Sequence, residues 1–390
     1  MSKQIIFCAD GTWNGPGAAP ASGGKPDVDS DTQKDAEVND KVTNVVKLFR
    51  NLAGDITPET ANLQDEAERA LKAPATGALT QIAKYMHGVG DSKNPVLRAL
   101  GGVLGAGVIA RIVRGYTFIS RCYEPGDSIH IVGFSRGAYT ARALAGMIAA
   151  VGLLNNKAYD PNDKTKAYLM GFEAWMKCKG VVFTGKNDLA SKLTDWAHAI
   201  GGAIARLTLK DKEFITGVRV KSVAVWDTVG SMGIPDYVTA GGRRDLFTFV
   251  DLTLSPMIDR GFHAMALDER RLDFPVTRWN TDSRIEQMWF VGAHSDVGGG
   301  YPATECGLSD IALDWMQTQL ASVGVQFAVP LLHKPDVTQF EQKFHTPWAK
   351  PPFNLTPQGR KPLPGDVFDA SVKKRWAATA AYQKDWPSLF

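Results

Sequence analysis

Four short apolar runs, each followed at once by a polar or glycine-rich cluster, constrain the fold of this chain more than any other feature. The runs are Gln4–Ala9, Ser128–Phe134, Val218–Trp226 and Gln287–Val291. Nearly continuous apolar and β-branched residues are typical of strands that are buried on both faces. Because ligands bind outside the carboxyl ends of the strands in an open parallel sheet, we expect the four polar clusters to meet in one crevice.

Helical patterns lie between these runs. Small apolar residues recur at helical spacing over Ala138–Ala150, and apolar residues do so over Leu308–Leu320, where Ser309 is a candidate N-cap. Alternating strands and helices indicate layers of helices on a mostly parallel sheet. The sequence therefore predicts an α/β fold with helices on both faces of the sheet.

The remaining segments predict one large core domain with insertions. Residues 1–330 contain all four runs and form the expected core. Within it, residues 15–40 lack periodicity and predict a long loop, and residues 155–213, which carry aromatic side chains, predict a cap-like insertion. Residues 331–390 predict a proline-rich tail that packs on the core and ends in a helical stretch near Ser371–Gln383.

Composition and net charge exclude several classes of protein. Of the 390 residues, 44% are hydrophobic and 22% are charged, which excludes disordered, collagen-like and coiled-coil chains. The 44 Lys and Arg residues nearly balance the 41 Asp and Glu residues, so no basic surface for nucleic acid is expected. The four cysteines are widely spaced and favour a reducing compartment over a disulfide scaffold.

The apolar stretches and the first residues predict where the chain is made. No apolar stretch reaches the roughly 20 residues that span a bilayer. The first residues lack the long apolar core and the small-residue cleavage site of a signal peptide. We therefore expect a chain made as a soluble cytoplasmic protein, whose export would require a route without a cleaved signal.

Residues 133–137, with the sequence GFSRG, match the pattern G-x-S-x-G. The pattern alone is weak, because a chain rich in glycine and serine matches it often by chance. Here an apolar strand leads into it and a small-residue helix leads out, which is the strand–turn–helix context of a nucleophile elbow. Ser135 is thus the predicted nucleophile. The alternative is an ordinary strand-to-helix turn in which the serine is an N-cap.

A serine nucleophile needs a general base and an acid that orients the base. In α/β-hydrolases the acid and the histidine follow the serine in that order, each at the end of a later strand. Asp227 and His294 meet both conditions. We expect one ring nitrogen of His294 about 2.6–3.2 Å from Ser135 Oγ, or somewhat farther without substrate, and the other ring nitrogen to face Asp227. His263 is the competing base, but its surroundings predict an amphipathic helix, where a histidine is more often a packing residue.

The turns at the strand ends supply the other candidate site residues. The backbone N–H of Arg136 and those of Gly11 and Thr12 are the predicted oxyanion-hole donors. Asp10 and Asp296 are carboxylates at the same edge and would suit a divalent cation such as Mg²⁺ or Ca²⁺. Alternatively, both fix glycine-rich turns through hydrogen bonds to the backbone. The main expectation is a site without a metal or other cofactor.

Several blocks of the chain resemble a bacterial α/β-hydrolase family once catalogued as a domain of unknown function, whose members include phospholipase effectors of type VI secretion systems. The blocks are FCADGTWN at 7–14, YMHGVG at 85–90, GFSRGAYTAR at 133–142, VWDTVGS at 225–231, HAMALDERR at 263–271 and WFVGAHSDVGGGY at 289–301. The resemblance implies an α/β-hydrolase-like fold and an esterase or lipase acting on glycerophospholipids. It also implies that Ser135 is the nucleophile, Asp227 the acid and His294 the base.

One departure from the family pattern lies in the tail. Members often carry a histidine just before a Ser-Val-x-x-Arg segment, whereas here Phe, Asp and Ala occupy residues 368–370 before Ser371. This difference disfavours a tail histidine as the base and supports His294.

The leading hypothesis is a phospholipase A that a type VI system delivers into the periplasm of target cells. Its expected partners are membrane phospholipid, a secretion carrier protein and an immunity protein, and not nucleic acid. A carboxylesterase for soluble esters would use the same three residues. A metal-dependent phosphoesterase that uses Asp10, Asp227 and Asp296 is the alternative from another class.

Overall fold

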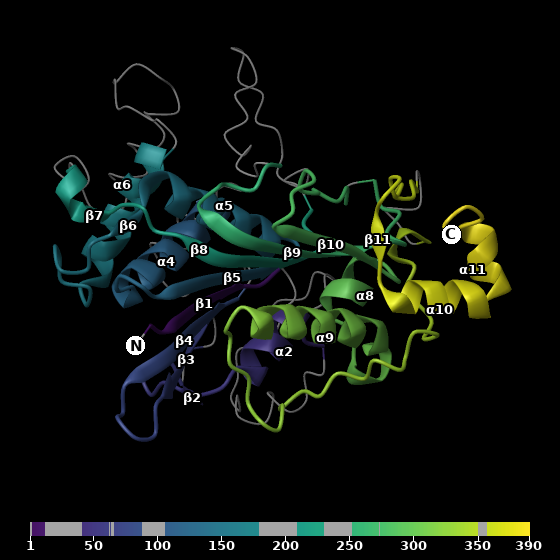
Figure 1. Ribbon diagram of the computed structural model, residues 1–390, viewed down its shortest axis with the longest axis horizontal. Helices are drawn as coiled ribbons and strands as arrows, with labels where there is room; N and C mark the ends of the chain where they lie inside the picture. The colour runs from purple at the N-terminus through teal and green to yellow at the C-terminus, as the bar shows by residue number, and fades with distance from the viewer. Residues whose placement is uncertain are drawn as a thin grey trace, which may run out of the picture.

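A central sheet forms the frame of the protein (Figure 1). The computed structural model describes residues 2–11, 41–61, 63, 66–87, 106–178, 209–229, 252–272, 274–349 and 357–390. Among these residues, no helix is long and apolar enough to cross a membrane.

Nine strands make up the sheet in the part of the chain that the structure describes. From one edge to the other they are β11 (Val367–Phe368), β10 (Ile285–Phe290), β9 (Ile258–Ala266), β8 (Val220–Trp226), β5 (Ser128–Phe134), β1 (Gln4–Ala9), β4 (Leu79–Met86), β3 (Glu66–Lys72) and β2 (Asp55–Ile56). Neighbours from β11 to β4 are parallel, and β3 and β2 each run antiparallel to the preceding strand. The fold is therefore α/β with a mostly parallel sheet.

The register of the parallel strands brings their carboxyl ends together. Ala9 at the end of β1 pairs with Gly133 of β5, and Gly133 pairs with Val225 of β8. Trp226 of β8 pairs with Ala264 of β9. The polar clusters that follow these strands consequently lie along one edge of the sheet, as the sequence predicted.

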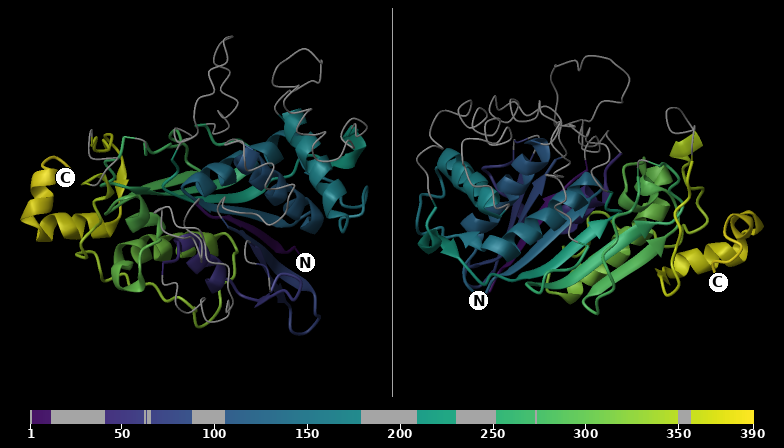
Figure 2. Two further views of the ribbon diagram at one scale, coloured as in Figure 1. Left: turned by 180° about the vertical axis from the view of Figure 1, so that it is seen from behind. Right: turned by 90° about the horizontal axis from the view of Figure 1, so that it is seen from above.

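Helices cover both faces of the sheet (Figures 1 and 2). On one face lie α4 (Ala106–Cys122), α5 (Arg136–Val151) and α6 (Lys164–Cys178), and on the other lie α2 (Asn44–Asn51) and α9 (Gly307–Ser322). The short α8 (His294–Gly298) begins just after β10, and α10 (Ala370–Ala378) and α11 (Ala380–Asp385) lie beyond the β11 edge. The remaining small elements are β6 (Leu153–Leu154), β7 (Phe214–Ile215), η2 (Asp211–Glu213), η3 (Ala303–Glu305) and η4 (Pro347–Ala349).

The segment around His263 is a strand, and the sequence-based prediction of a helix there is wrong. His263 lies in β9, between β8 and β10, and is completely buried. A central parallel strand is apolar on both faces, so its run of small and apolar residues lacks the alternation that distinguishes a strand from a buried helix.

Two inserted or terminal segments pack on the core. Phe172 and Trp175 of α6, from the first half of the predicted insertion 155–213, are buried in the cluster that α4 and α5 form with the sheet. The second half of that insertion, residues 179–208, and the predicted loop 15–40 lie outside the described residues. In the tail, Val372 and Tyr382 are buried against the ends of β9 and β10.

Candidate active site

Ser135 occupies a sharp turn between β5 and α5. Its backbone angles are φ 58° and ψ −124°, which a residue with a side chain rarely adopts. A Cβ on Gly133 would lie 2.3 Å from the Gly137 carbonyl oxygen, and one on Gly137 would lie 2.1 Å from the Ala9 carbonyl oxygen. The two glycines of the motif are thus required because the backbone passes too close for any side chain, as in a nucleophile elbow.

The Ser135 side chain does not cap the helix that follows it. Although Ser135 stands at the N-cap position of α5, its hydroxyl makes no capping hydrogen bond. The N-cap alternative derived from the sequence is therefore wrong for this turn. The Ser135 N–H donates to the Trp226 carbonyl oxygen at 3.2 Å, which ties the turn to the residue just before Asp227.

Asp227 and His294 form a hydrogen-bonded pair at the same edge of the sheet. His294 Nδ1 lies 2.6 Å from Asp227 Oδ2. Asp227 follows β8 with a φ of 38°, is completely buried, and accepts the Ala266 N–H on Oδ1 at 2.9 Å. The carboxylate is therefore held from two directions, by the ring and by the end of β9.

Aromatic rings fix the plane of the His294 imidazole. Its centroid lies 4.6 Å from that of Phe134, the residue before Ser135, and 5.1 Å from that of Phe274. The His294 N–H donates to Glu269 Oε2 at 3.2 Å. These contacts hold the histidine beside the turn that carries Ser135.

The second ring nitrogen of His294 is buried and has no hydrogen-bond partner among the described residues. The hydrogen bond expected between Ser135 Oγ and His294 is therefore not formed in this arrangement. Catalytic hydrogen bonds are often long or misaligned without substrate and tighten when it binds. Nε2 remains a free acceptor on a ring whose other nitrogen is engaged.

The surroundings of the pair favour a charged acid and a neutral base. For Asp227, burial raises the pKa, but the Arg360 guanidinium and the His294 hydrogen bond outweigh it and hold the pKa well below its usual range. For His294, burial lowers the pKa more than Asp227 raises it. At neutral pH the acid is thus ionised and the ring unprotonated, as a general base requires.

Arg360 is a site residue that the sequence analysis did not identify. It comes from the tail and contacts both carboxylate oxygens of Asp227 through its two terminal nitrogens. A lone arginine in a proline-rich segment gives no local signal of such a role. Its proximity to Asp227 depends on the path of the tail over the end of the sheet.

His263 is neutral and accepts a hydrogen bond from the loop that follows Asp227. Its Nε2 accepts the Thr228 N–H at 3.1 Å, and burial lowers its pKa to about 3. Its ring lies edge-on to Trp279. His294, and not His263, is the histidine that contacts the acid.

Asp10 and Asp296 each accept a hydrogen bond from the turn in which they lie and others from distant parts of the chain. Asp10 accepts hydrogen bonds from the Gly11 N–H at 2.7 Å, from Thr43 Oγ1 at 2.9 Å and from the Tyr85 hydroxyl at 2.8 Å, and burial raises its pKa to about 6. Asp296 accepts the N–H groups of Ala293 and His345, each at 2.9 Å. Within the described ranges, no group of three or more His, Cys, Asp or Glu side chains is arranged to hold a metal ion.

Of the three predicted oxyanion donors, the structure describes two, the backbone N–H groups of Gly11 and Arg136. The Gly11 N–H donates to Asp10 Oδ1 at 2.7 Å in this arrangement, and its role as an oxyanion donor stays a prediction. Thr12 lies outside the described residues. Arg136 is the first residue of α5, where backbone N–H groups have no intrahelical acceptor.

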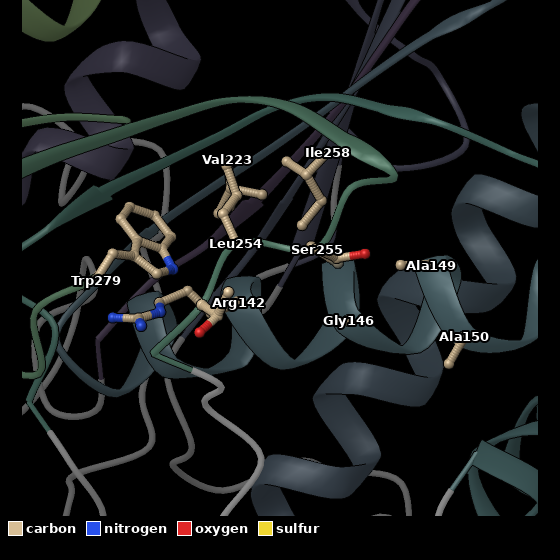
Figure 3. A pocket seen from close by; sticks show the side chains of 11 residues that line it. Arg142, Gly146, Ala149, Ala150, Val223, Leu254, Ser255, Ile258 and Trp279 are labelled. Atoms are coloured by element: carbon tan, nitrogen blue, oxygen red, sulfur yellow. The ribbon is translucent and has the colours of Figure 1, made fainter. Parts of the chain in front are cut away.

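A cavity of about 250 Å³ lies beside α5, away from the three residues just described (Figure 3). Arg142 and Trp279 lie together at one part of it, with the guanidinium 4.3 Å from the ring centroid. Gly146, Ala149 and Leu254 line another part. Since none of Ser135, Asp227 and His294 lines this cavity, it is not the place where the ester bond would lie.

The fold and the site define a class of protein, namely a mostly parallel α/β protein whose serine, acid and histidine lie at one edge of the sheet. Residues 3–319 match the family described as "T6SS, Phospholipase effector Tle1-like, catalytic domain". The chain belongs to this family of type VI secretion phospholipase effectors.

Individual relatives are distant. The chain is 24% identical over 273 residues to the uncharacterized protein YEL023C of Saccharomyces cerevisiae, covering 70% of this chain and 32% of that protein. An uncharacterized protein from Pseudomonas aeruginosa has a crystal structure with a TM-score of 0.41 and 16% identity, covering 89% of this chain and 48% of that one. The Tle1 effector bound to the VgrG spike of the type 6 secretion system has a TM-score of 0.36 and 18% identity, covering 79% and 52%. The chain thus spans about a third of the yeast protein and about half of each solved chain.

Proposed function

We propose that this chain is a serine esterase of the phospholipase A type, with Ser135 as nucleophile, His294 as general base and Asp227 as the acid that orients the base. The observation that carries the proposal is the 2.6 Å contact between His294 Nδ1 and Asp227 Oδ2. This contact leaves Nε2 available to take a proton. The strained turn at Ser135 supports the assignment of the nucleophile.

In the proposed reaction, His294 Nε2 takes the Ser135 hydroxyl proton as Oγ attacks the ester carbonyl carbon. A new C–O bond forms, and the carbonyl π electrons move onto the oxygen. The Arg136 N–H and the N-terminus of α5 stabilise that oxyanion. The intermediate then expels the alcohol, which receives the proton from His294, and water hydrolyses the acyl-enzyme by the same steps.

Family membership supports phospholipid as the substrate, and we extend the proposal to delivery by a type VI system into the periplasm of target cells. A carrier of the VgrG kind is the proposed export partner, because the Tle1 effector is bound to VgrG in its solved structure. An immunity protein in the producing cell is the second proposed partner. The proposed chemistry involves neither a metal nor a nucleic acid.

The metal-dependent phosphoesterase is less well supported. It would need Asp10, Asp227 and Asp296 to share a cation, but Arg360 and His294 occupy the oxygens of Asp227. The other two carboxylates bind their own turns, as described above. A carboxylesterase for soluble esters would use the same three residues, so only the choice of substrate separates it from a phospholipase.

The proposal is tested with vesicles of phosphatidylethanolamine and phosphatidylglycerol. Wild type should release fatty acid and lysophospholipid, and Ser135→Ala should do so at least about 10³-fold more slowly. Ser309→Ala is the matched control, because it removes a buried hydroxyl that donates to the Cys306 carbonyl oxygen at the start of α9. Fast turnover of short soluble esters without lysophospholipid would favour the carboxylesterase. Activity that survives in Ser135→Ala but is lost with a chelator would favour the phosphoesterase.

Delivery is tested by directing the protein to the periplasm with an added signal peptide. Wild type should be toxic there and nearly harmless in the cytoplasm, and Ser135→Ala should be harmless in both. Equal growth of cells carrying wild type and Ser135→Ala in the periplasm would contradict the proposed role as an antibacterial toxin.

A further inference from the structure

We propose that Arg360 is a positioning residue, which locks the Asp227 carboxylate against His294 Nδ1 and offsets its negative charge, so that the ring stays an effective base. This inference rests on the proposed function of Ser135, Asp227 and His294. It assigns part of the active site to the tail of the chain.

The geometry of the contact is bidentate. One terminal nitrogen of Arg360 donates to Asp227 Oδ1, and the other donates to Oδ2 at 3.0 Å. Oδ2 also contacts His294 Nδ1, and Oδ1 also accepts the Ala266 N–H. A planar guanidinium that meets both oxygens fixes the rotation of the carboxylate, which a single donor would not do.

Arg360 is itself held in place by the backbone around the site. Its terminal nitrogens also donate to the carbonyl oxygens of Ala266 and Phe274, each at 2.7 Å. Ala266 ends β9, and the Phe274 ring packs on His294. Arg360 is only 9% exposed, so this ion pair is shielded from the solvent that weakens surface pairs. The guanidinium therefore joins the acid, the strand beneath it and the loop that packs on the base.

The charges around His294 show what Arg360 contributes. The ring faces the Asp227 carboxylate, and its backbone N–H meets the Glu269 carboxylate, which Arg271 pairs at 2.8 Å. His263, the other titratable group facing Asp227, is buried and neutral. Arg360 is thus the cation that balances Asp227, just as Arg271 balances Glu269. Without it, an uncompensated carboxylate beside the ring would favour the protonated, inactive imidazole.

The position of Arg360 in the chain makes this inference specific. The match to the family's catalytic domain ends at residue 319, whereas Arg360 lies in the described segment 357–390. The core strands supply the serine, the acid and the histidine. The tail supplies the cation that holds the acid.

The test compares Arg360→Gln and Arg360→Lys in the full chain, with a short soluble ester as substrate. Arg360→Gln should lower kcat by about 10²-fold with little change in KM, because a small displacement of the catalytic pair is that costly. The acid limb of its profile of kcat/KM against pH is the range in which activity falls as His294 becomes protonated. This limb should lie about one pH unit higher than in wild type, because His294 loses a nearby positive charge. Arg360→Lys keeps the positive charge but loses the pair of nitrogens that donates to both carboxylate oxygens. Its kcat should therefore fall, while its acid limb should stay closer to that of wild type.

Arg375→Gln is the matched control. Arg375 is another buried arginine of the tail and donates to the carbonyl oxygens of Phe340 and Gln342, both at 2.8 Å. Within the described ranges it forms no hydrogen bond or ion pair with Asp227, so its replacement should affect folding stability without moving the acid limb. A role for Arg360 in folding alone would make the Arg360 and Arg375 variants behave alike.

A titration of the His294 ring by NMR, assigned with His294→Gln, gives a readout independent of activity. The ring should become protonated at higher pH in Arg360→Gln than in wild type. An unchanged titration together with an unchanged acid limb would overturn the inference. If Arg360→Gln does not fold, a wild-type kcat in Arg360→Lys would overturn it instead. If wild type shows no Ser135-dependent hydrolysis, the proposed function fails, and the His294 titration still tests whether Arg360 offsets the charge of Asp227.

Discussion

His294 Nδ1 lies 2.6 Å from Asp227 Oδ2, although β9 lies between the two strands that precede these residues, β8 and β10. The contact is formed because β8, β9 and β10 are parallel and end at the same edge, so the two side chains meet above the end of β9. Ala266, the last residue of β9, donates its N–H to Asp227 Oδ1. The intervening strand thus helps to hold the acid.

Replacement of Asp227 by Asn should reduce both activity and stability. An asparagine cannot hold His294 in the tautomer that accepts a proton on Nε2, and in serine proteases the same change costs about 10⁴-fold in kcat. It also leaves Arg360 buried without a carboxylate, which should lower the free energy of unfolding by about 3–5 kcal/mol. Ester turnover and urea unfolding measure the two effects. An Asp227→Asn protein as stable as wild type would contradict the buried ion pair.

Ester hydrolysis should persist in mildly acidic solution. Burial lowers the pKa of His294 and outweighs the opposing hydrogen bond and charge of Asp227. Because the base works only when it is unprotonated, the acid limb of kcat/KM should lie below the ordinary histidine value of about 6.5. A profile measured with a soluble ester gives this value directly. An acid limb above the ordinary histidine pKa would show that the Asp227 carboxylate affects the pKa of His294 more than burial does.

Ser135→Gly should be inactive but more stable than Ser135→Ala. Both lack the hydroxyl, but only glycine adopts the Ser135 backbone angles without strain. Relief of that strain should raise the free energy of unfolding of Ser135→Gly above that of Ser135→Ala by about 1 kcal/mol. Denaturant unfolding of the two variants measures the difference. Equal stabilities would mean that the turn stores no strain.

His345→Gln should destabilise the protein in acid more than in alkali. His345 Nδ1 lies 2.7 Å from Asp296 Oδ1 and Nε2 lies 3.0 Å from Glu305 Oε2, and the Asp296 hydrogen bond is the main cause of a raised pKa. A histidine with a raised folded-state pKa stabilises the fold below its unfolded pKa, and this effect is lost as pH rises through the folded value.

The measurement for His345 is Tm at about pH 5.5 and about pH 8.5, which lie on either side of the ordinary histidine pKa. His333→Gln is the control, because burial lowers the pKa of His333 and its loss should show the opposite trend. A Tm difference between His345→Gln and wild type that is the same at both pH values would argue against an ionic role for His345.

Four of the nine described strands of the central sheet could be predicted, because their signals are local. The bounds of β1 and β5 agree with the predicted runs, and those of β8 and β10 differ by only a few residues. β3 was missed because Glu66 and Glu68 make it look like an exposed segment. In the fold, Lys84 of the neighbouring strand lies 2.8 Å from Glu66 and 3.1 Å from Glu68, so charges that suggest solvent are paired within the structure.

The sequence by itself determined where the site lies, because a strand end, a G-x-S-x-G turn and the order of acid and histidine are each encoded in a few adjacent residues. Only the tertiary structure decided which groups complete it. It places Arg360 on both oxygens of Asp227, and it engages the Gly11 amide with Asp10. The Arg360 contact joins residues far apart in the chain and depends on the route of the tail, which no local pattern of side chains specifies.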